Sequence, residues 1–331
     1  MEKIVLVLTS AQDRSVEPVL EKFDLMGQKF FRFDTDLFPE KTTLSLGLES
    51  GNLDGVIELG GGLERVEFGS IKSCWYRHVA PANVTDARAY SRFIKEESKV
   101  ALWSLYTSLD AFWMNPPLTG ARLLNNNKLY QMKTASSFGI RTPKTLISNN
   151  PYSLLDFCRR CGGRLAVKML SGHVFVREGS TDTMCVYTNL VSEKDLADRV
   201  EEISLAPILA QEYISKKLEL RITIVGQRVF ACEIHSQDSE RTTHDWRRYD
   251  FDKVKHLKHN LPKKIEERLL RLVTFWGLQF AAIDMIITPE DQYVFLEVNP
   301  QGQWGWIEDL TGMPISRAIA ELLTNPPETV T

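Results

Sequence analysis

Near its C-terminus the chain reads IDMIITPEDQYVFLEVNP (residues 283–300), two apolar runs separated by the turn sequence TPED. This pattern predicts a β-hairpin, and a regular register through that turn places Asp284 opposite Phe295. Because side chains alternate along a strand, Glu297 and Asn299 then share the face of Asp284, with the two carboxylates as diagonal neighbours. The hairpin is therefore predicted to gather oxygen ligands on one face of an otherwise apolar ribbon.

Asp284, Glu297 and Asn299 carry the oxygen ligands that a hard cation prefers, and we predict a magnesium (Mg2+) site here. Buried carboxylates are costly unless they are neutralised, and the flanking residues are apolar. The alternative is a set of solvated charges on a strand face. Magnesium held by only two or three protein groups usually completes its shell with phosphate oxygens, so the hairpin also predicts a bound nucleotide.

Two lysines are candidates for binding phosphates. Lys168 interrupts the apolar strand sequence LAVKML, whereas a surface lysine would alternate with polar neighbours. Lys128, in NNNKLYQM, opens a predicted helix, where an anion gains from both the ammonium group and the unpaired backbone amides. Lys128 is equally compatible with an ordinary helix start.

The predicted strand APILAQEYI (206–214) ends in polar residues that could hold an adenine base. The backbone of Gln211, Glu212, Tyr213 and Ile214 would offer donors and acceptors to the base edge, and the Ile214 side chain would pack on the ring. Glu219, shortly downstream, could accept hydrogen bonds from ribose hydroxyls. Taken singly, each of these residues also fits an ordinary strand end.

Composition argues against other classes of protein. The 331 residues carry a formal net charge of -3, which disfavours a general nucleic-acid binder. The basic stretch 247–264 is interrupted by aspartates and has too few aromatic residues for a stacking platform. The N-terminal run IVLVL is too short for a signal-peptide core, and no run approaches membrane-spanning length, so no membrane partner is expected.

The five cysteines are scattered and lack the spacing of a disulfide framework or a zinc site. Cys158 and Cys161 form CRRC, but one such pair supplies only half of a tetrahedral site, so we interpret them as helix-end residues. This cysteine pattern predicts a reducing, cytoplasmic setting.

Strand and helix patterns predict an α/β chain with three lobes. An Asn-rich segment beginning near 125 and the strand at 206–214 mark the two boundaries. We therefore predict an N-terminal domain over 1–118, a central lobe over 119–208 and a C-terminal lobe over 209–331. The main expected elements are strands near 4–8 and 29–33, helices near 15–26, 86–109, 192–203, 262–276 and 315–323, and hairpins around Gly60–Gly62 and at Gly226–Gln227.

The order of these motifs resembles the ATP-grasp superfamily: NK, then VKML, then QEYI and LELRITIVG, then Asp284 followed by FLEVNP. The finer motifs FRFDTDLFPE (31–40), CWYRH (74–78), KMLSG (168–172) and DWRR (245–248) are similar to those of the microviridin-type graspetide synthetases, ATP-grasp maturases that cross-link ribosomal peptides. The resemblance spans essentially the whole chain. It implies an α/β architecture (α+β lobes): an ATP-grasp fold preceded by a pre-ATP-grasp α/β domain.

Enzymes of this family use ATP to phosphorylate an Asp or Glu side chain of a precursor peptide. A Ser/Thr hydroxyl or a Lys amine then attacks the acyl phosphate, giving an ω-ester or an ω-amide. The resemblance implies the same roles for the lysines, the 211–214 segment, Glu219 and the three metal ligands as those given above. Arg221, Arg247 and Arg248 are candidates for gripping the γ-phosphate or the acyl phosphate, because guanidinium forks match such oxygens. Arg247 is preferred, and a solvated basic loop is the alternative.

Family members also bind a helical leader segment of the precursor peptide through the hairpin and helix of the central lobe. The matching stretch is about 172–200, where Asp195 and Asp198 are candidate partners for a leader arginine, or simply solvated acidic residues. The family often forms homodimers. EVNPQGQWGW shares features with both the ester-forming and the amide-forming branches, so the bond type stays open.

Two rival functions share most of these residues. The first is another ATP-grasp carboxylate-amine ligase, acting on free amino acids or on a protein tail. The second is a nucleotide-binding regulatory protein without catalysis, which the complete set of lysines and metal ligands disfavours.

Overall fold

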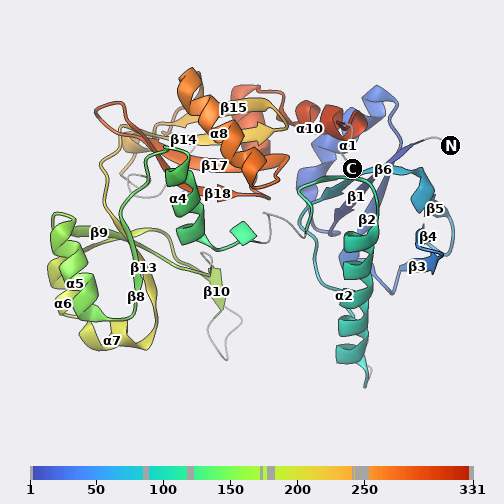
Figure 1. The fold of residues 1–331 in the computed structure, drawn as a ribbon, viewed down its shortest axis with the longest axis horizontal. Coiled ribbons are helices and arrows are strands. Elements are labelled where there is room, and N and C mark those ends of the chain that lie inside the picture. The colour runs from blue at the N-terminus through green and yellow to red at the C-terminus, as the bar shows by residue number, and fades with distance from the viewer. Residues whose placement is uncertain are drawn as a thin grey trace.

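The computed structural model describes residues 3–84, 89–117, 123–171, 174–176, 183–240, 242 and 253–327. Within these residues the strands form five sheets. Figure 1 shows how the N-terminal, central and C-terminal regions of the chain are arranged. A four-stranded sheet and a three-stranded sheet belong to the N-terminal region, a four-stranded sheet and a two-stranded hairpin to the central region, and a five-stranded sheet to the C-terminal region.

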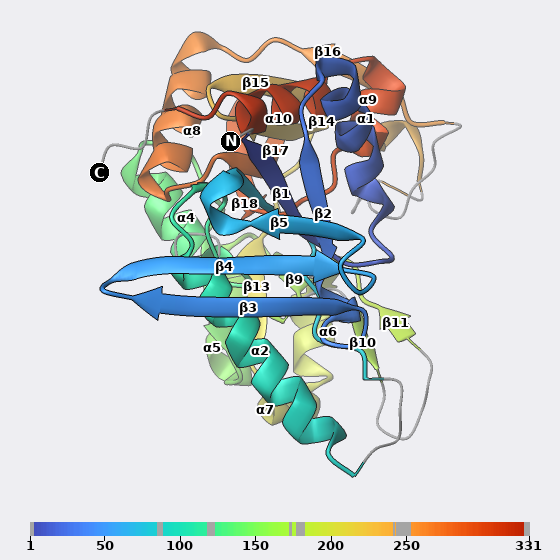
Figure 2. The same ribbon diagram turned by 90° about the vertical axis from the view of Figure 1, so that its right-hand side faces the viewer.

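The N-terminal region is built on a parallel sheet of strand order β2-β1-β6-β7. Its buried strands alternate with helices, as the sequence pattern predicts. Beside it lies the antiparallel sheet β3-β4-β5, whose β4–β5 hairpin turns at the three glycines (Figure 2). The bounds are β1 (Ile4–Thr9), α1 (Glu17–Met26), β2 (Phe30–Asp34), β3 (Thr42–Glu49), β4 (Asn52–Leu59), β5 (Glu64–Glu67), β6 (Ile71–Tyr76), α2 (Ser91–Ser108) and β7 (Phe112–Met114).

The central region is an antiparallel sheet of order β12-β9-β13-β8 with helices on one face. The β13 strand crosses the predicted boundary after residue 208 and pairs with this sheet. The bounds are α4 (Lys128–Ser137), β8 (Thr145–Ser148), α5 (Pro151–Arg160), β9 (Arg164–Lys168), β10 (Val174–Val176), β11 (Thr183–Cys185), β12 (Asn189–Ser192), α6 (Glu193–Ala197), α7 (Val200–Leu205) and β13 (Ile208–Glu212).

The prediction of a single continuous helix in this region is wrong. The expected helix near 192–203 is broken into α6 and α7, because Arg199 has a φ of -128, outside the helical range. Leu196 of α6 and Ile203 of α7 both pack into the same small core against α5.

The C-terminal region is a five-stranded antiparallel sheet of order β16-β15-β14-β17-β18. Helix α8 covers one face of this sheet. Its residues Leu269, Leu272 and Val273 are buried there in an apolar cluster with side chains of the strands. The predicted hairpin turn at Gly226 is confirmed, whereas β16 and α9 were not expected. The bounds are β14 (Leu218–Val225), β15 (Arg228–Ile234), β16 (His256–His259), α8 (Lys263–Phe275), β17 (Phe280–Ile287), β18 (Tyr293–Asn299), α9 (Gly305–Thr311) and α10 (Ile315–Thr324).

The β17–β18 hairpin contains a β-bulge, and this corrects the predicted register. Met285 lies opposite Phe295, but Asp284 lies opposite Glu297, with the register shift between Asp284 and Met285. The predicted pairing of Asp284 with Phe295 is therefore wrong, since Phe295 is fully buried on the α8 side. The extra residue, Leu296, restores the alternation that brings Glu297 to the face of Asp284.

Candidate active site

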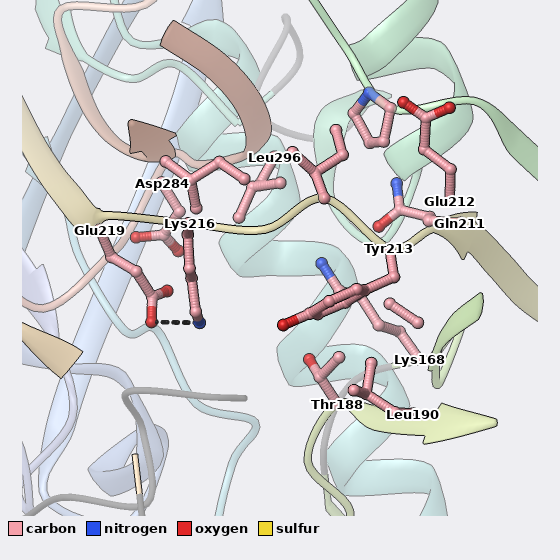
Figure 3. Close-up of a pocket in the computed structure, with 14 residues that line it drawn as sticks. Lys168, Thr188, Leu190, Gln211, Glu212, Tyr213, Lys216, Glu219, Asp284 and Leu296 are labelled. Atoms are coloured by element: carbon pink, nitrogen blue, oxygen red, sulfur yellow. Dashed lines mark hydrogen bonds and ion pairs between the residues drawn. The ribbon is translucent and has the colours of Figure 1, made fainter. Parts of the chain in front are cut away.

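A cleft lies between the central sheet and the C-terminal sheet, and it contains most of the residues predicted to bind a nucleotide. It encloses roughly 670 Å³ of empty space, open solvent included, within the range of small-molecule sites. Figure 3 shows Asp284 and Leu296 on one side, Thr188 and Leu190 on the other, and Tyr213 and Lys168 between them. Its lining residues are Pro143, Ala166, Lys168, Thr188, Leu190, Gln211, Glu212, Tyr213, Ile214, Lys216, Glu219, Asp284, Ile286 and Leu296.

The two predicted metal-binding carboxylates are directly opposite each other, and each faces a cation. The Arg221 Nη1 atom donates to the Asp284 Oδ1 atom at 2.9 Å, and both side chains are nearly fully buried. The Lys128 Nζ atom lies 3.1 Å from the Glu297 Oε2 atom, with both side chains about 15% exposed. These ion pairs offset the cost of burying two carboxylates side by side.

Helix α4 is held against β18, which explains why Lys128 reaches Glu297. The Gln131 side chain accepts from the Val298 amide at 2.9 Å and donates to the Val298 carbonyl at 3.1 Å. The Asn127 side chain caps the helix by accepting from the Tyr130 amide. Lys128 is therefore the first residue of a capped helix whose amide end points toward the carboxylates, an arrangement that suits an anion.

Lys168 is the last residue of β9, paired with Leu209 of β13, and its side chain reaches into the cleft. It enters from the central sheet, whereas Lys128 enters from the side of β18. The two predicted phosphate-binding lysines thus come from different elements of the central region, helix α4 and strand β9.

The predicted adenine segment leaves the sheet at the cleft. Gln211 and Glu212 pair with β9, and β13 ends at Glu212, so Tyr213 and Ile214 follow the last ladder residue. The Gln211 side chain donates to the Thr145 hydroxyl at 3.2 Å. The Glu212 carboxylate lies 3.6 Å from the Lys144 Nζ atom. Both residues line the cleft.

Glu219 lies in the cleft and is held by a lysine that the sequence analysis did not identify. The Lys216 Nζ atom donates to the Glu219 Oε1 atom at 2.7 Å, and both side chains are buried (Figure 3). Leu296 and Ile286 were also missed as cleft residues. Ile286 could have been found from its period-two spacing with Asp284, but Leu296 could not, because the predicted register placed Phe295 rather than Leu296 on the face of Asp284.

The donor set fits magnesium in its chemistry. Asp284, Glu297 and Asn299 lie on one face of the hairpin and offer oxygen atoms only. The Asn299 Oδ1 atom also accepts from the Gln301 amide at 3.0 Å, which orients the side-chain oxygen. Among the described residues no cluster of three His, Cys, Asp or Glu side chains could hold a metal, so an ion here would need further oxygens from a ligand.

The remaining predicted residues lie apart from the cleft or outside the described part of the chain. Arg247 and Arg248 fall outside the described residues. Asp195 is exposed on α6 in the central region, where its carboxylate accepts from the Ser192 amide and hydroxyl, each at 2.7 Å. These hydrogen bonds lower the pKa of Asp195. Asp198 is the exposed C-cap of α6.

Comparison with known proteins identifies the class. Residues 4–119 match the MvdD pre-ATP grasp domain, and residues 125–323 match the RimK-like ATP-grasp domain. The chain therefore belongs to the RimK-like ATP-grasp family and carries an MvdD-type pre-ATP-grasp domain at its N-terminal end. The expected fold is confirmed. No curated protein matched the chain.

Solved structures of similar proteins cover nearly the whole chain. Macrocyclase MdnC from Microcystis aeruginosa MRC, bound with precursor peptide MdnA, is 34% identical over 97% of this chain and 99% of its own, with a TM-score of 0.82. A Chryseobacterium gregarium RiPP-associated ATP-grasp ligase, in complex with ADP and a leader and core peptide, is 32% identical over 98% and 96%, with a TM-score of 0.87. Macrocyclase MdnB from M. aeruginosa MRC is 28% identical over 97% and 99%, with a TM-score of 0.77.

In the described part of the chain, no helix combines the length and the apolar character that a membrane-spanning segment needs.

Proposed function

We propose that this protein is an ADP-forming peptide macrocyclase that acts on a ribosomal precursor peptide. It would phosphorylate Asp or Glu side chains of the precursor and join them to Ser/Thr hydroxyls or Lys amines. The observation that carries the proposal is the cleft lined by Lys168, Asp284 and the 211–214 segment, beside the Lys128–Glu297 ion pair, in a chain that is 34% identical to a macrocyclase over 97% of its length.

The residues around the cleft divide into a nucleotide set and a metal set. Lys128 and Lys168 would bind ATP phosphates, the backbone of 211–214 would hold the adenine, and Glu219, fixed by Lys216, would accept from the ribose. Asp284, Glu297 and Asn299 would hold magnesium, which when bound neutralises charge on phosphate oxygens. Lys128 and Arg221 form ion pairs with the carboxylates of Glu297 and Asp284. Once magnesium binds these two carboxylates, the two cations would be available to bind phosphate.

The reaction needs charge neutralisation and positioning rather than an enzyme nucleophile. A precursor carboxylate oxygen would bond to the γ-phosphorus as the bond to ADP breaks. The hydroxyl or amine would then attack the acyl carbon, releasing inorganic phosphate and one proton. Arg221, buried beside Asp284, would bind the transferred phosphoryl group, and Arg247 and Arg248 are proposed as further grips on it.

The leader segment of the precursor is proposed to bind the central lobe near α6, through Asp198 and Asp195. We also propose that the chain is divided into an N-terminal domain (1–118), a central lobe (119–208) and a C-terminal lobe (209–331). A homodimer and a cytoplasmic location remain predictions from the sequence, and light scattering of the purified protein would measure the first.

The function is tested by incubating the protein with ATP, magnesium and short candidate precursors that contain Thr and Asp/Glu clusters, and weighing the products. Each ring should remove one water and release one ADP. Hydroxylamine then separates labile esters from stable amides. ADP release with a free amino acid and no dependence on a leader would instead support an amino-acid ligase, and nucleotide binding without any turnover would support a regulatory protein.

A further inference from the structure

The carboxyl ends of strands β6 and β7 in the N-terminal parallel sheet lie against residues 300–303, which Arg77 and Asn115 contact. In the order β2-β1-β6-β7, neighbouring β1 and β6 are not consecutive in sequence, so the connections after these two strands diverge. Open parallel sheets bind ligands in the crevice at such a switch point. Here the crevice holds Arg77, the residue directly after β6, whose amide donates to the Leu8 carbonyl at 2.9 Å.

The Arg77 side chain extends from the N-terminal domain and donates hydrogen bonds to a loop of the C-terminal region. It is only 1% exposed. Its Nη1 atom donates to the carbonyl oxygens of Gln301 at 2.7 Å and Gly302 at 3.2 Å, and its Nη2 atom donates to the Gln303 Oε1 atom at 3.1 Å. The Ser15 hydroxyl accepts from the same guanidinium at 3.2 Å.

The loop that Arg77 contacts, residues 300–303, directly follows Asn299, a proposed metal ligand. The same loop also forms a hydrogen bond with Arg221. The Gln303 carbonyl accepts from the Arg221 Nη2 atom at 3.0 Å, while Arg221 Nη1 donates to Asp284. Hydrogen bonds on either side of the loop thus connect Arg77, through the covalent backbone of residues 301–303, to Arg221 and Asp284.

The two guanidinium groups also interact electrostatically. Burial lowers the pKa of Arg77 to about 10, and the neighbouring Arg221 charge lowers it as well, against the opposing influence of Asp13. Arg77 therefore keeps its positive charge at neutral pH. A second contact from the same sheet supports the loop, because the Asn115 Nδ2 atom, after β7, donates to the Pro300 carbonyl at 2.6 Å.

We propose that Arg77 is a positioning residue for catalysis, through which the N-terminal domain fixes the 300–303 loop and, by way of the Gln303 carbonyl, the orientation of Arg221. The inference rests on the proposed function for its kinetic consequence. It gives the N-terminal domain a part in phosphoryl transfer without contact to the nucleotide.

The kinetic test compares Arg77→Met, Arg77→Lys and a matched control, Lys72→Met. Lys72 also joins the two regions, donating to the Thr324 carbonyl at 2.6 Å, but it makes no contact with the loop. Arg77→Met should lower kcat for ring formation about 10²-fold, because a displacement near 1 Å at a reacting group can cost that much. The KM values for ATP and precursor should stay close to wild type. Arg77→Lys, which keeps the charge but not the fork, should fall between, and Lys72→Met should match wild type.

A double-mutant cycle separates positioning from general damage to the fold. In an Arg221→Lys background, Arg77→Met should lower kcat further by less than about twofold, because residues acting through one another are not additive. The proposal is overturned if the two losses multiply, or if Arg77→Met alone leaves kcat unchanged.

A measurement without turnover makes the inference independent of the proposed function. Hydrogen exchange of a peptide covering 300–304 reports the Gln301 and Gly302 amides, which donate to the Asn299 side chain and carbonyl. Protection should fall in Arg77→Met and Arg77→Lys but not in Lys72→Met. If it falls while the wild-type protein forms no ring, the proposed function fails and the loop clamp stands. If protection is unchanged, the clamp fails.

Discussion

Arg221 and Asp284 lie directly opposite each other on the adjacent strands β14 and β17 and form a buried ion pair of 2.9 Å. Both side chains are nearly fully buried, at 6% and 8% exposed. The Arg221 guanidinium thus lies beside the Asp284 carboxylate within the sheet, and the proposed function assigns the first to phosphate and the second to a metal.

Asp284→Asn should abolish magnesium-dependent ADP binding and lower turnover by at least about 10²-fold, since a metal typically supplies several kcal/mol of charge stabilisation. The free energy of unfolding should fall by about 1–3 kcal/mol, because Arg221 loses its charged partner. Calorimetric titration with ADP and magnesium measures the first effect, and denaturant unfolding the last. The control is Asp291→Asn in the same hairpin, where an exposed ion pair with Lys217 should matter little. Equal ADP binding by wild type and Asp284→Asn would contradict the metal assignment.

Lys128→Met should weaken ATP binding by about tenfold or more, because a hydrogen bond to a charged group is typically worth about 1.5–3 kcal/mol. Lys133→Met on the same helix is the matched control, since Lys133 is exposed and points away from β18. The measurement is KM for ATP at saturating precursor. An unchanged KM in Lys128→Met would mean that this lysine serves only to neutralise Glu297.

Gly302→Ala should disturb Arg221 directly. A Cβ atom at this glycine would collide with the Ala282 Cβ atom and come within 2.5 Å of the Arg221 Nη2 atom. We expect a loss of about 1–3 kcal/mol in the free energy of unfolding, typical of overpacking, together with reduced turnover. Gly305→Ala is the control, because nothing lies within 4 Å of the corresponding Cβ position. Wild-type turnover in Gly302→Ala would show that the loop can shift without moving Arg221.

Asp13 should make stability depend on acidic pH. Burial raises the pKa of Asp13, but hydrogen bonds from Ser15 and Thr9 and the Arg77 charge outweigh burial, so this pKa lies below its ordinary value of 3.8. A carboxyl with a depressed pKa stabilises the fold above its unfolded pKa, and this stabilisation is lost as pH falls through the lower folded value. Wild type should therefore exceed Asp13→Asn in stability near neutral pH.

The difference between wild type and Asp13→Asn should shrink as pH drops below about 4, and denaturant unfolding from about pH 6 to about pH 3 measures it. Asp24→Asn, an exposed change on α1, should follow wild type throughout. A difference that is constant across this range would contradict the assignment.

Asp198→Asn should weaken binding of an arginine-containing leader peptide by about two- to fivefold, as expected for an exposed ion pair. Added salt should reduce the difference. Ser192→Ala is the control, because it removes the α6 cap partner of Asp195 but keeps both acidic side chains. Anisotropy of a labelled leader gives the affinities. Equal affinities for wild type and Asp198→Asn would place leader binding elsewhere.

Much of the fold could be predicted because the local patterns agree with the final packing. The apolar strands β1, β14 and β17 and the amphipathic helix α8 were predictable for this reason. The β16 strand was missed because HLKH is largely polar and becomes a strand only by pairing with β15. Helix α9 was missed for the related reason that it is short and follows a glutamine- and glycine-containing loop.

Most of the candidate site residues could be named from the sequence, but the groups with which they form ion pairs and hydrogen bonds could not. The pairing of Lys128 with Glu297 depends on how α4 packs on β18, and Arg77 meets the 300–303 loop more than two hundred positions along the chain. Such contacts follow from tertiary packing, which no local pattern contains. The bulge, too, left no signal, since FLEV reads as an ordinary strand.

That bulge places two consecutive residues on the Asp284 side of the ribbon: Leu296, an apolar wall of the cleft, and Glu297, the charged residue opposite Asp284. Deleting Leu296 would leave Asp284 and Glu297 facing each other in an unbroken ladder. A substitution at Leu296 should therefore reshape the apolar wall of the cleft while the acidic pair keeps its place, so that the shape of the site and its charge can be varied independently.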